Sequence, residues 1–381
     1  MLTKLKDVEW SWVDQPQHLF EVAEELASED ILAVDTESNS LYAYQEQVCL
    51  IQFSTRHKDY LIDTMALPDL SALQPIFNSP KILKVFHAAE YDLICLFRDY
   101  QFRFNNLFDT MIAARTLGLK SVGLGALLET YFNIQVEKKY QRANWGKRPL
   151  NPEMLAYARM DSRYLIPLQE KLRQALKKSN RWDLALEDFR RLIVGIEDTT
   201  ESNTTDFWKV HGARDLKPAK AAVLKSLYEF REAQAEVQNK PAFKVFSSQA
   251  LIKIADACPR DRQALADLPG IHQHTLNRYG RGLIQAVETG MAAKPEYPPH
   301  HQRPENAVLE RIEALREWRK LIGRKLSVPS DVILPRDVLN RIAWADPENT
   351  SELQQEMHDV PHRFERFGKD IIQVIKQQET K

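Results

Sequence analysis

Two acidic residues lie where a rigid element would present both of them to the same point. Asp35 and Glu37 directly follow residues 31–34 (ILAV), a short apolar run that predicts a buried strand. Residues two apart in a strand point to the same face, so both carboxylates can act together. A second D-x-E, Asp346 and Glu348, lies in the turn-like stretch ADPENTS, where no regular element orients it. The first pair is therefore the candidate for chemistry.

A third acid follows a second predicted strand. Residues 81–86 (KILKVF) predict the strand, and residues 90–100 (EYDLICLFRDY) predict a helix with Asp92 in its first turns. An acid there could also simply answer the helix dipole. Asp92 is a candidate for a functional site only in combination with the other acids.

The fourth acid shares a helix face with a tyrosine. Asn151 is a good N-cap and Pro152 suits the first helical position, so a helix is expected from there. Tyr157 and Asp161 then lie four residues apart on one face. A buried hydrogen bond between them is the structural alternative to a catalytic role.

Four carboxylates from distant segments repel one another unless positive charge lies among them. Divalent cations are suited to this because they take oxygen ligands. Two such ions about 4 Å apart can clamp the attacking and leaving oxygens of a phosphodiester. The sequence thus predicts metal-dependent phosphodiester hydrolysis. A paired-carboxylate glycosidase would need only two acids.

The order of these motifs resembles a known family. D-x-E, then His-x4-Asp beginning at His87, then Tyr-x3-Asp resembles the DEDD 3′–5′ exonucleases of the subgroup that carries tyrosine. Three further segments are similar to ribonuclease D: LIQF (50–53), LFDTMIAARTLG (107–118) and KRPLNPEMLAYARMDSRYLIPL (147–168). The similarity spans about residues 15–190. The resemblance implies an α/β ribonuclease H-like domain, a mixed sheet flanked by helices.

The resemblance also implies roles for individual residues. The implied ligands of two divalent ions, Mg²⁺ or Mn²⁺, are Asp35, Glu37, Asp92 and Asp161, which with Tyr157 form the expected catalytic set. Asp35 would bridge both ions, and Tyr157 would orient the attacking water. Thr36 and His87 are expected to contact substrate. Asp109 also matches an acid of the family, and we interpret it as a structural or supporting residue.

A basic and aromatic segment leads into the helix of Tyr157. Between residues 138 and 148 there is no acid, and Tyr140 lies among the basic residues. Basic residues beside aromatic ones suit a strand whose bases stack while its phosphates are neutralised. A plain solvated loop is the alternative. The expected substrate-binding residues here are Lys138, Lys139, Arg142, Trp145 and Arg148.

Length and composition limit the class of protein. A chain of 381 residues should form two or three domains, and 44% apolar and 28% charged residues are ordinary for a globular protein. Cys49, Cys95 and Cys258 are too scattered for a zinc site or a disulfide framework. There is neither an apolar run of 18 residues nor a secretory h-region. We expect a cytoplasmic monomer that does not engage a membrane.

The second half of the chain repeats itself. Residues 223–232 (VLKSLYEFRE) are echoed by 308–317 (VLERIEALRE), and residues 278–288 (RYGRGLIQAVE) by 366–376 (RFGKDIIQVIK). Each copy predicts several short amphipathic helices. The first resembles the HRDC domain, and the second resembles a diverged copy of it.

Three domains are therefore expected: an exonuclease domain over 1–200 and HRDC domains over 207–292 and 303–381. The segments 195–206 and 291–305 would be linkers, because the first is rich in Ser, Thr and Asp and the second in Pro. Residues 206–290 carry 13 Lys and Arg against 9 Asp and Glu, whereas residues 303–381 balance at 14 each. The first copy is thus expected to do more of any electrostatic RNA binding.

By resemblance, the expected function is 3′–5′ exoribonuclease activity. RNA would be shortened from its single-stranded 3′ end to nucleoside 5′-monophosphates, and tRNA precursors are the implied substrate class. Two alternatives remain: a 3′–5′ DNA exonuclease in repair, because the same site serves both nucleic acids, and a catalytically silent RNA-binding adaptor.

Overall fold

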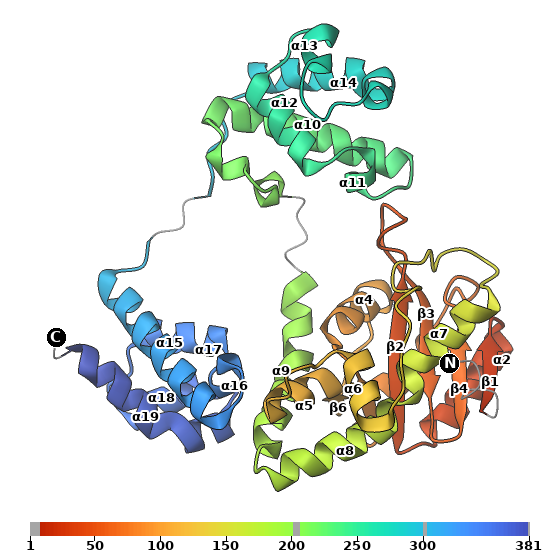
Figure 1. Cartoon of the computed structure of the whole chain (residues 1–381), viewed down its shortest axis with the longest axis vertical. Coiled ribbons are helices and arrows are strands. Elements are labelled where there is room, and N and C mark those ends of the chain that lie inside the picture. Colours follow the sequence, from red (N-terminus) through yellow and green to blue (C-terminus); the bar gives the residue numbers. More distant parts are fainter. Residues whose placement is uncertain (1–7, 201–205, 300–302, 380–381) are drawn as a thin grey trace. The chain divides into compact units, whose positions relative to one another are not determined.

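The computed structural model describes residues 8–200, 206–299 and 303–379 (Figure 1). The chain divides into two compact units. One unit comprises Met1–Glu37, Val48–Glu201 and Arg303–Lys381. The other comprises Ser38–Gln47 and Ser202–Gln302. The α/β part and the second helical copy therefore form one unit, although the first helical copy lies between them in the chain.

The α/β part is built on a six-stranded mixed sheet in the order β1-β4-β3-β2-β5-β6. β1 is parallel to β4, β2 to β5 and β5 to β6, while β3 is antiparallel to β4. The strands are β1 (Glu9–Val13), β2 (Ile31–Ser38), β3 (Val48–Ser54), β4 (Lys58–Ile62), β5 (Leu83–Phe86) and β6 (Leu107–Asp109). A mixed sheet flanked by helices confirms the fold class expected from the sequence.

Helices cover both faces of this sheet (Figure 1). They are α2 (Pro16–Ala27), α3 (Gln74–Asn78), α4 (Glu90–Tyr100), α5 (Thr110–Leu117), α6 (Leu124–Phe132), α7 (Pro152–Arg163), α8 (Leu165–Lys178) and α9 (Trp182–Thr200). One core cluster joins residues of α2, α3 and α4 to the sheet, and another joins residues of α5 to α9. The strand predicted at 81–86 begins slightly later, and the helix predicted at 90–100 is α4.

The alternation of side chains along β2 determines which face of the sheet each acid occupies. Leu32 and Val34 belong to the core cluster of α2 to α4, whereas Ile31 and Ala33 belong to the cluster of α5 to α9. This alternation is the period of two that strands impose on side chains. Asp35 continues the second series, so it faces the helices that include α7.

The second helical copy consists of α15 (Asn306–Leu326), α16 (Ser330–Ile333), α17 (Arg336–Ala345), α18 (Thr350–Glu356) and α19 (Pro361–Glu379). It packs on α9 through ion pairs. Arg363 on α19 is 0% exposed, and its guanidinium donates to Glu187 Oε2 at 2.7 Å and to Asp188 Oδ2 at 2.8 Å. Arg191 on α9 pairs with Asp337 at 2.6 Å. The copy is thus built into the same unit as the six-stranded sheet.

Arg363→Ala should strongly destabilise this unit. The substitution leaves Glu187 and Asp188 on α9 without the cation that neutralises them, and breaking a buried ion pair costs about 3–5 kcal/mol. Lys369→Ala, which changes an exposed side chain on the same helix, is the matched control. Urea unfolding monitored by circular dichroism measures both variants. Equal stability of the two would show that the buried pair does not hold the copy in place.

The first helical copy consists of α10 (Pro218–Val237), α11 (Ala242–Val245), α12 (Ser248–Ala257), α13 (Arg262–Ala266) and α14 (Gln273–Ala292). In both copies the helices alternate in length, in the order long, short, long, short, long. This shared order confirms the internal repeat. The segment that joins β2 to β3 belongs to the same unit: the Tyr44 N–H donates to Asn239 Oδ1 at 3.1 Å, and Lys244 Nζ lies 4.2 Å from the centre of the Tyr42 ring.

The linker predicted over 195–206 is wrong in its first part, because α9 continues to Thr200. Ile196 is 3% exposed and packs in the core with Leu192 and Ile193, so the apolar periodicity of α9 continues into the predicted linker. Residues 201–205 lie outside the described part of the chain. Within the described ranges, no helix is long and apolar enough to cross a membrane.

Candidate active site

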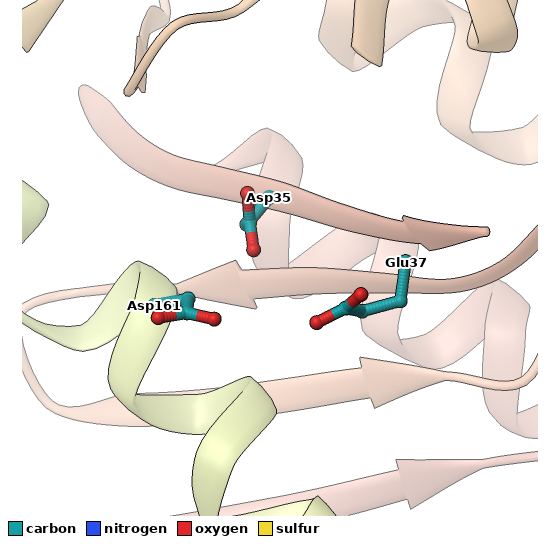
Figure 2. A group of neighbouring side chains, drawn as sticks. All are labelled: Asp35, Glu37 and Asp161. Atoms are coloured by element: carbon teal, nitrogen blue, oxygen red, sulfur yellow. The ribbon is translucent and has the colours of Figure 1, made fainter. Parts of the chain in front are cut away.

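Three of the four predicted acids come together in space. Ligand oxygens of Asp35, Glu37 and Asp161 all lie within 4.8 Å of one another. Figure 2 shows the two carboxylates of β2 and the one from α7 turned toward a common point. The D-x-E motif and the Tyr-x3-Asp motif, more than a hundred residues apart in sequence, thus form one cluster.

Local sequence explains the position of Asp161. Asn151 caps α7 by accepting from the Met154 N–H at 2.8 Å, and Pro152 occupies the first helical position. The helix begins where the sequence predicts, which sets the rotation of every later residue around its axis. Asp161 therefore lies one turn after Tyr157 and faces β2.

Asp92 approaches from the other side of the sheet. It lies in the first turn of α4, and its Oδ1 accepts a hydrogen bond from the Thr36 hydroxyl. Thr36 has the opposite orientation to Asp35 because the two are consecutive in a strand. Asp92 lies near enough for its charge to raise the pKa of Asp35. It is close to the cluster but is not one of the three mutually adjacent acids.

The electrostatics of the cluster call for a cation. Burial, followed by the charges of Asp92 and Asp161, raises the pKa of Asp35 well above its usual range, and burial followed by Asp35 does the same for Glu37. Burial raises the pKa of Asp92 and of Asp161 to about 7. Among the described residues, no lysine or arginine pairs with Asp35, Glu37 or Asp161. An oxygen-only donor set of this kind fits a hard divalent cation.

Tyr157 is held as a neutral hydroxyl beside the cluster. It is 5% exposed, and it lies close enough to Asp161 for that acid to raise its pKa. Burial and the neighbouring acids raise its pKa well above the usual value, so it keeps its proton at neutral pH. The ring centroids of Trp145 and Tyr140 lie 6.1 Å and 5.9 Å from that of Tyr157. The hydroxyl can therefore donate a hydrogen bond but cannot act as a base.

The cluster opens into a cavity of about 820 Å³. Its lining includes Thr36, His87 and Lys138, all three predicted from the sequence to bind substrate. Sequence reasoning missed the rest of the wall: Gly123, Leu124, Gly125, Ala126, Glu129, Gln135, Val136 and Gln141. The sequence Gly123-Leu124-Gly125 at the start of α6 could have indicated this wall, because glycines at a helix start allow close approach to a ligand.

The structure does not bring the other predicted contacts to this cavity. Trp145 is 1% exposed and packs behind Tyr157, so it cannot stack on a base as expected. Arg148 donates to both oxygens of Asp63 and to the Cys49 carbonyl, which uses its guanidinium to fix the loop. Lys139 pairs with the exposed Glu153 at 2.9 Å. Arg142 does not line the cavity either.

Two residues at the edge of the site are held by helix α5. The Thr110 hydroxyl lies 2.8 Å from His87 Nδ1, and burial lowers the pKa of this histidine, so it is neutral at physiological pH. Asp109 accepts from the Met111 and Ile112 N–H groups as the cap of α5 and from the Ala89 N–H before α4. The structural interpretation of Asp109 is confirmed.

The raised pKa values predict a pH dependence of stability without metal. Between about pH 4 and 7, the folded state retains protons that the unfolded chain has already released, so the free energy of unfolding falls as pH rises. In EDTA, the thermal midpoint should be lower at pH 8 than at pH 5.5. Thermal scans of wild type and Asp161→Asn test this, and the variant should show the smaller loss. An identical pH dependence in both would contradict the assignment.

Comparison with protein families finds domains of a kind that agrees with the acid cluster described above. A family model described as "3′–5′ exonuclease" matches residues 10–177, and the HRDC domain model matches residues 220–287 and 308–375. The fold and the acid cluster are those expected of a 3′–5′ exonuclease domain. The chain therefore contains a 3′–5′ exonuclease domain followed by two HRDC domains, and it is similar over most of its length to bacterial ribonuclease D.

Individual relatives fall into two groups. Ribonuclease D of Nitrobacter hamburgensis is 28% identical, with 88% of this chain and 89% of the relative covered. The exosome complex exonuclease RRP6 of Saccharomyces cerevisiae is 33% identical over 69% of this chain, but only 38% of the relative is covered. The chain thus spans little more than a third of the length of that longer relative.

Solved structures show the same fold. The catalytic core of RRP6 from Trypanosoma brucei superposes with a TM-score of 0.65 at 26% identity and covers 75% of this chain and 81% of that one. Escherichia coli RNase D superposes with a TM-score of 0.71 at 21% identity, over 97% of this chain and 99% of that one. The latter likeness extends over nearly the whole length of both chains.

Proposed function

We propose that this protein is a metal-dependent 3′–5′ exoribonuclease that shortens RNA to nucleoside 5′-monophosphates. The observation that carries the proposal is the cluster of Asp35, Glu37 and Asp161 beside Tyr157, at the mouth of a cavity in an exonuclease fold. Relatives named ribonuclease D and exosome exonuclease support RNA as the substrate class. Single-stranded 3′ ends of structured RNA, such as tRNA precursors, are the proposed substrates.

The acid cluster would hold two divalent ions, Mg²⁺ or Mn²⁺. Asp35, Glu37 and Asp161 would supply ligand oxygens directly, and Asp92 would offer Oδ2 while Thr36 holds its Oδ1. When bound, such ions stabilise the charge that develops on the attacking and leaving oxygens of a phosphodiester. Their charge would also return the four raised carboxyl pKa values toward the ionised range.

The chain itself would orient the reactants. The neutral Tyr157 hydroxyl would hydrogen-bond the attacking water, and its ring contacts with Trp145 and Tyr140 would hold it in place. Thr36 fixes the rotamer of Asp92. These residues therefore contribute through position rather than through covalent chemistry.

Two features of the cavity wall suit a phosphate backbone. Gly123, the N-cap of α6, makes no side-chain cap, so the first N–H groups of this helix are not satisfied in that way, and residues 123–126 line the cavity. Lys138 lies on the same wall. Substrate phosphates next to the scissile bond would be bound there.

Lys138→Gln should weaken substrate use, whereas Lys139→Gln should not. Lys138 lines the cavity, while Lys139 is committed to Glu153 at an exposed site. Loss of one phosphate contact should reduce the slope of log affinity against log salt by roughly 0.7 on a single strand. Steady-state kinetics and binding at several salt concentrations measure both variants. If the two neighbours behave alike, Lys138 has no specific role.

The proposed activity is tested with RNA and DNA labelled at the 5′ or 3′ end, in Mg²⁺, Mn²⁺ or EDTA. Progressive shortening of 5′-labelled RNA, with mononucleotide released from the 3′ label only when metal is present, is the expected result. Faster loss of DNA would favour a DNA exonuclease. Binding of RNA without cleavage in either metal would favour an adaptor.

A further inference from the structure

A second cavity, of about 410 Å³, lies where three parallel strands begin. Its wall includes Ile31, Leu83 and Leu107, the first residues of β2, β5 and β6. Asp35 lies four residues further along β2, about 13 Å away at 3.3 Å per residue. The two cavities share no lining residue, so this one is separate from the candidate active site.

One side of this cavity is aromatic. Phe108, Phe189 and Trp182 line it, and the ring centroid of Phe108 lies 4.7 Å from that of Phe189 and 6.3 Å from that of Trp182. Trp182 remains partly exposed, unlike the two phenylalanines. A partly exposed flat ring next to buried apolar rings suits a planar aromatic ligand.

A buried amide beside these rings lacks a partner. Gln169 on α8 lines the cavity and is only 2% exposed, and its Nε2 donates to no acceptor in the part of the chain that the structure describes. Leaving such a donor without an acceptor is costly, and native structures rarely do so. A ligand with acceptors on the edge of a planar ring would satisfy it.

The charges around the cavity leave two cations without carboxylate partners. Arg56 pairs with both acids of the wall, Asp30 at 3.5 Å and Glu170 at 3.6 Å. Lys81 and Arg173 have no ion pair among the described residues. The Arg173 guanidinium lies over the Trp182 ring, 5.4 Å from its centroid, and Lys177 Nζ lies 5.9 Å from the same centroid. The ligand should therefore combine a planar ring with negative charge.

We propose that this cavity binds a nucleoside 5′-monophosphate. Its base would lie against Trp182 with its edge at Gln169, and its phosphate would lie at Lys81 and Arg173. The volume falls in the range of small-molecule sites, about 300–1,000 Å³. The ligand class follows from the cavity alone. That such nucleotides are also the products of this enzyme rests on the proposed function.

Calorimetric titration of the full-length protein with AMP, GMP, CMP and UMP tests the proposal. EDTA is included because a metal-free acid cluster repels phosphate at the active site. Arg173→Gln and Gln169→Leu should each weaken binding at least about fivefold, as expected for loss of a charged or hydrogen-bonding contact. Gln169→Leu should fold normally, since it removes an unpartnered donor. Lys138→Gln in the active-site cavity and Lys178→Gln on α8 should leave affinity unchanged.

Adenosine and inorganic phosphate, titrated separately, should each bind more weakly than AMP. Unchanged affinity in Arg173→Gln and Gln169→Leu, or loss of binding in Lys138→Gln alone, would overturn the proposal. Phosphate binding as tightly as AMP would also overturn it, because the ring would then contribute nothing. The labelled-RNA assay is independent of this titration, so a failure of the exonuclease function and a failure of the second site would be seen separately.

Discussion

A loss of more than about 100-fold in kcat is expected for each of four variants: Asp35→Asn, Glu37→Gln, Asp92→Asn and Asp161→Asn. Loss of an outer partner of a metal site typically costs 10- to 100-fold, and loss of a charged ligand should exceed that. The largest losses are expected for Asp35 and Glu37, because burial and the charges of the other acids raise the pKa of both. Initial rates on short single-stranded RNA in saturating Mg²⁺ measure the effect.

The same variants should be as stable as wild type without metal, or more stable. Each removes one of several mutually repelling carboxylates, so thermal midpoints in EDTA separate a lost ligand from a damaged fold. Glu348→Gln, which changes an exposed acid of the other D-x-E, is the matched control and should be neutral in both assays. Near-normal turnover in any two of the four variants would refute the proposed site.

Tyr157→Phe is expected to lower kcat by about 10²–10⁴-fold, the range for a lost proton-transfer or positioning contact. The phenylalanine ring should still pack against Trp145, but the hydroxyl that would hold the water is gone. RNA affinity should change little, because the ring is 5% exposed and offers little surface to substrate.

Tyr140→Phe provides the matched control for this variant. Its ring contacts that of Tyr157, but its hydroxyl bonds the exposed Glu153 instead of an acid of the cluster. It should retain nearly full kcat. If binding of RNA weakens in Tyr157→Phe in proportion to the rate, the hydroxyl contacts substrate and does not position water.

Much of the site could be predicted because its parts are set by local rules. The apolar run before Asp35, the cap at Asn151 and the spacing of Tyr157 and Asp161 each depend on neighbours within one element. The periods of strands and helices convert such patterns into faces. The two helical copies were also visible, since each repeats the same order of amphipathic segments.

Tertiary structure decided which long-range partner each side chain meets. Trp145 and Arg148 have the composition of a substrate-binding loop, yet one packs behind Tyr157 and the other is tied to Asp63, 85 residues away in sequence. Arg363 looks like an ordinary basic residue of a surface helix, but α9 surrounds it with acids. No local pattern records such partners, because burial and ion pairing depend on elements that meet only when the chain folds. The sequence therefore determined which residues share a face of each helix or strand. The packing of these elements decided which residues line the two cavities.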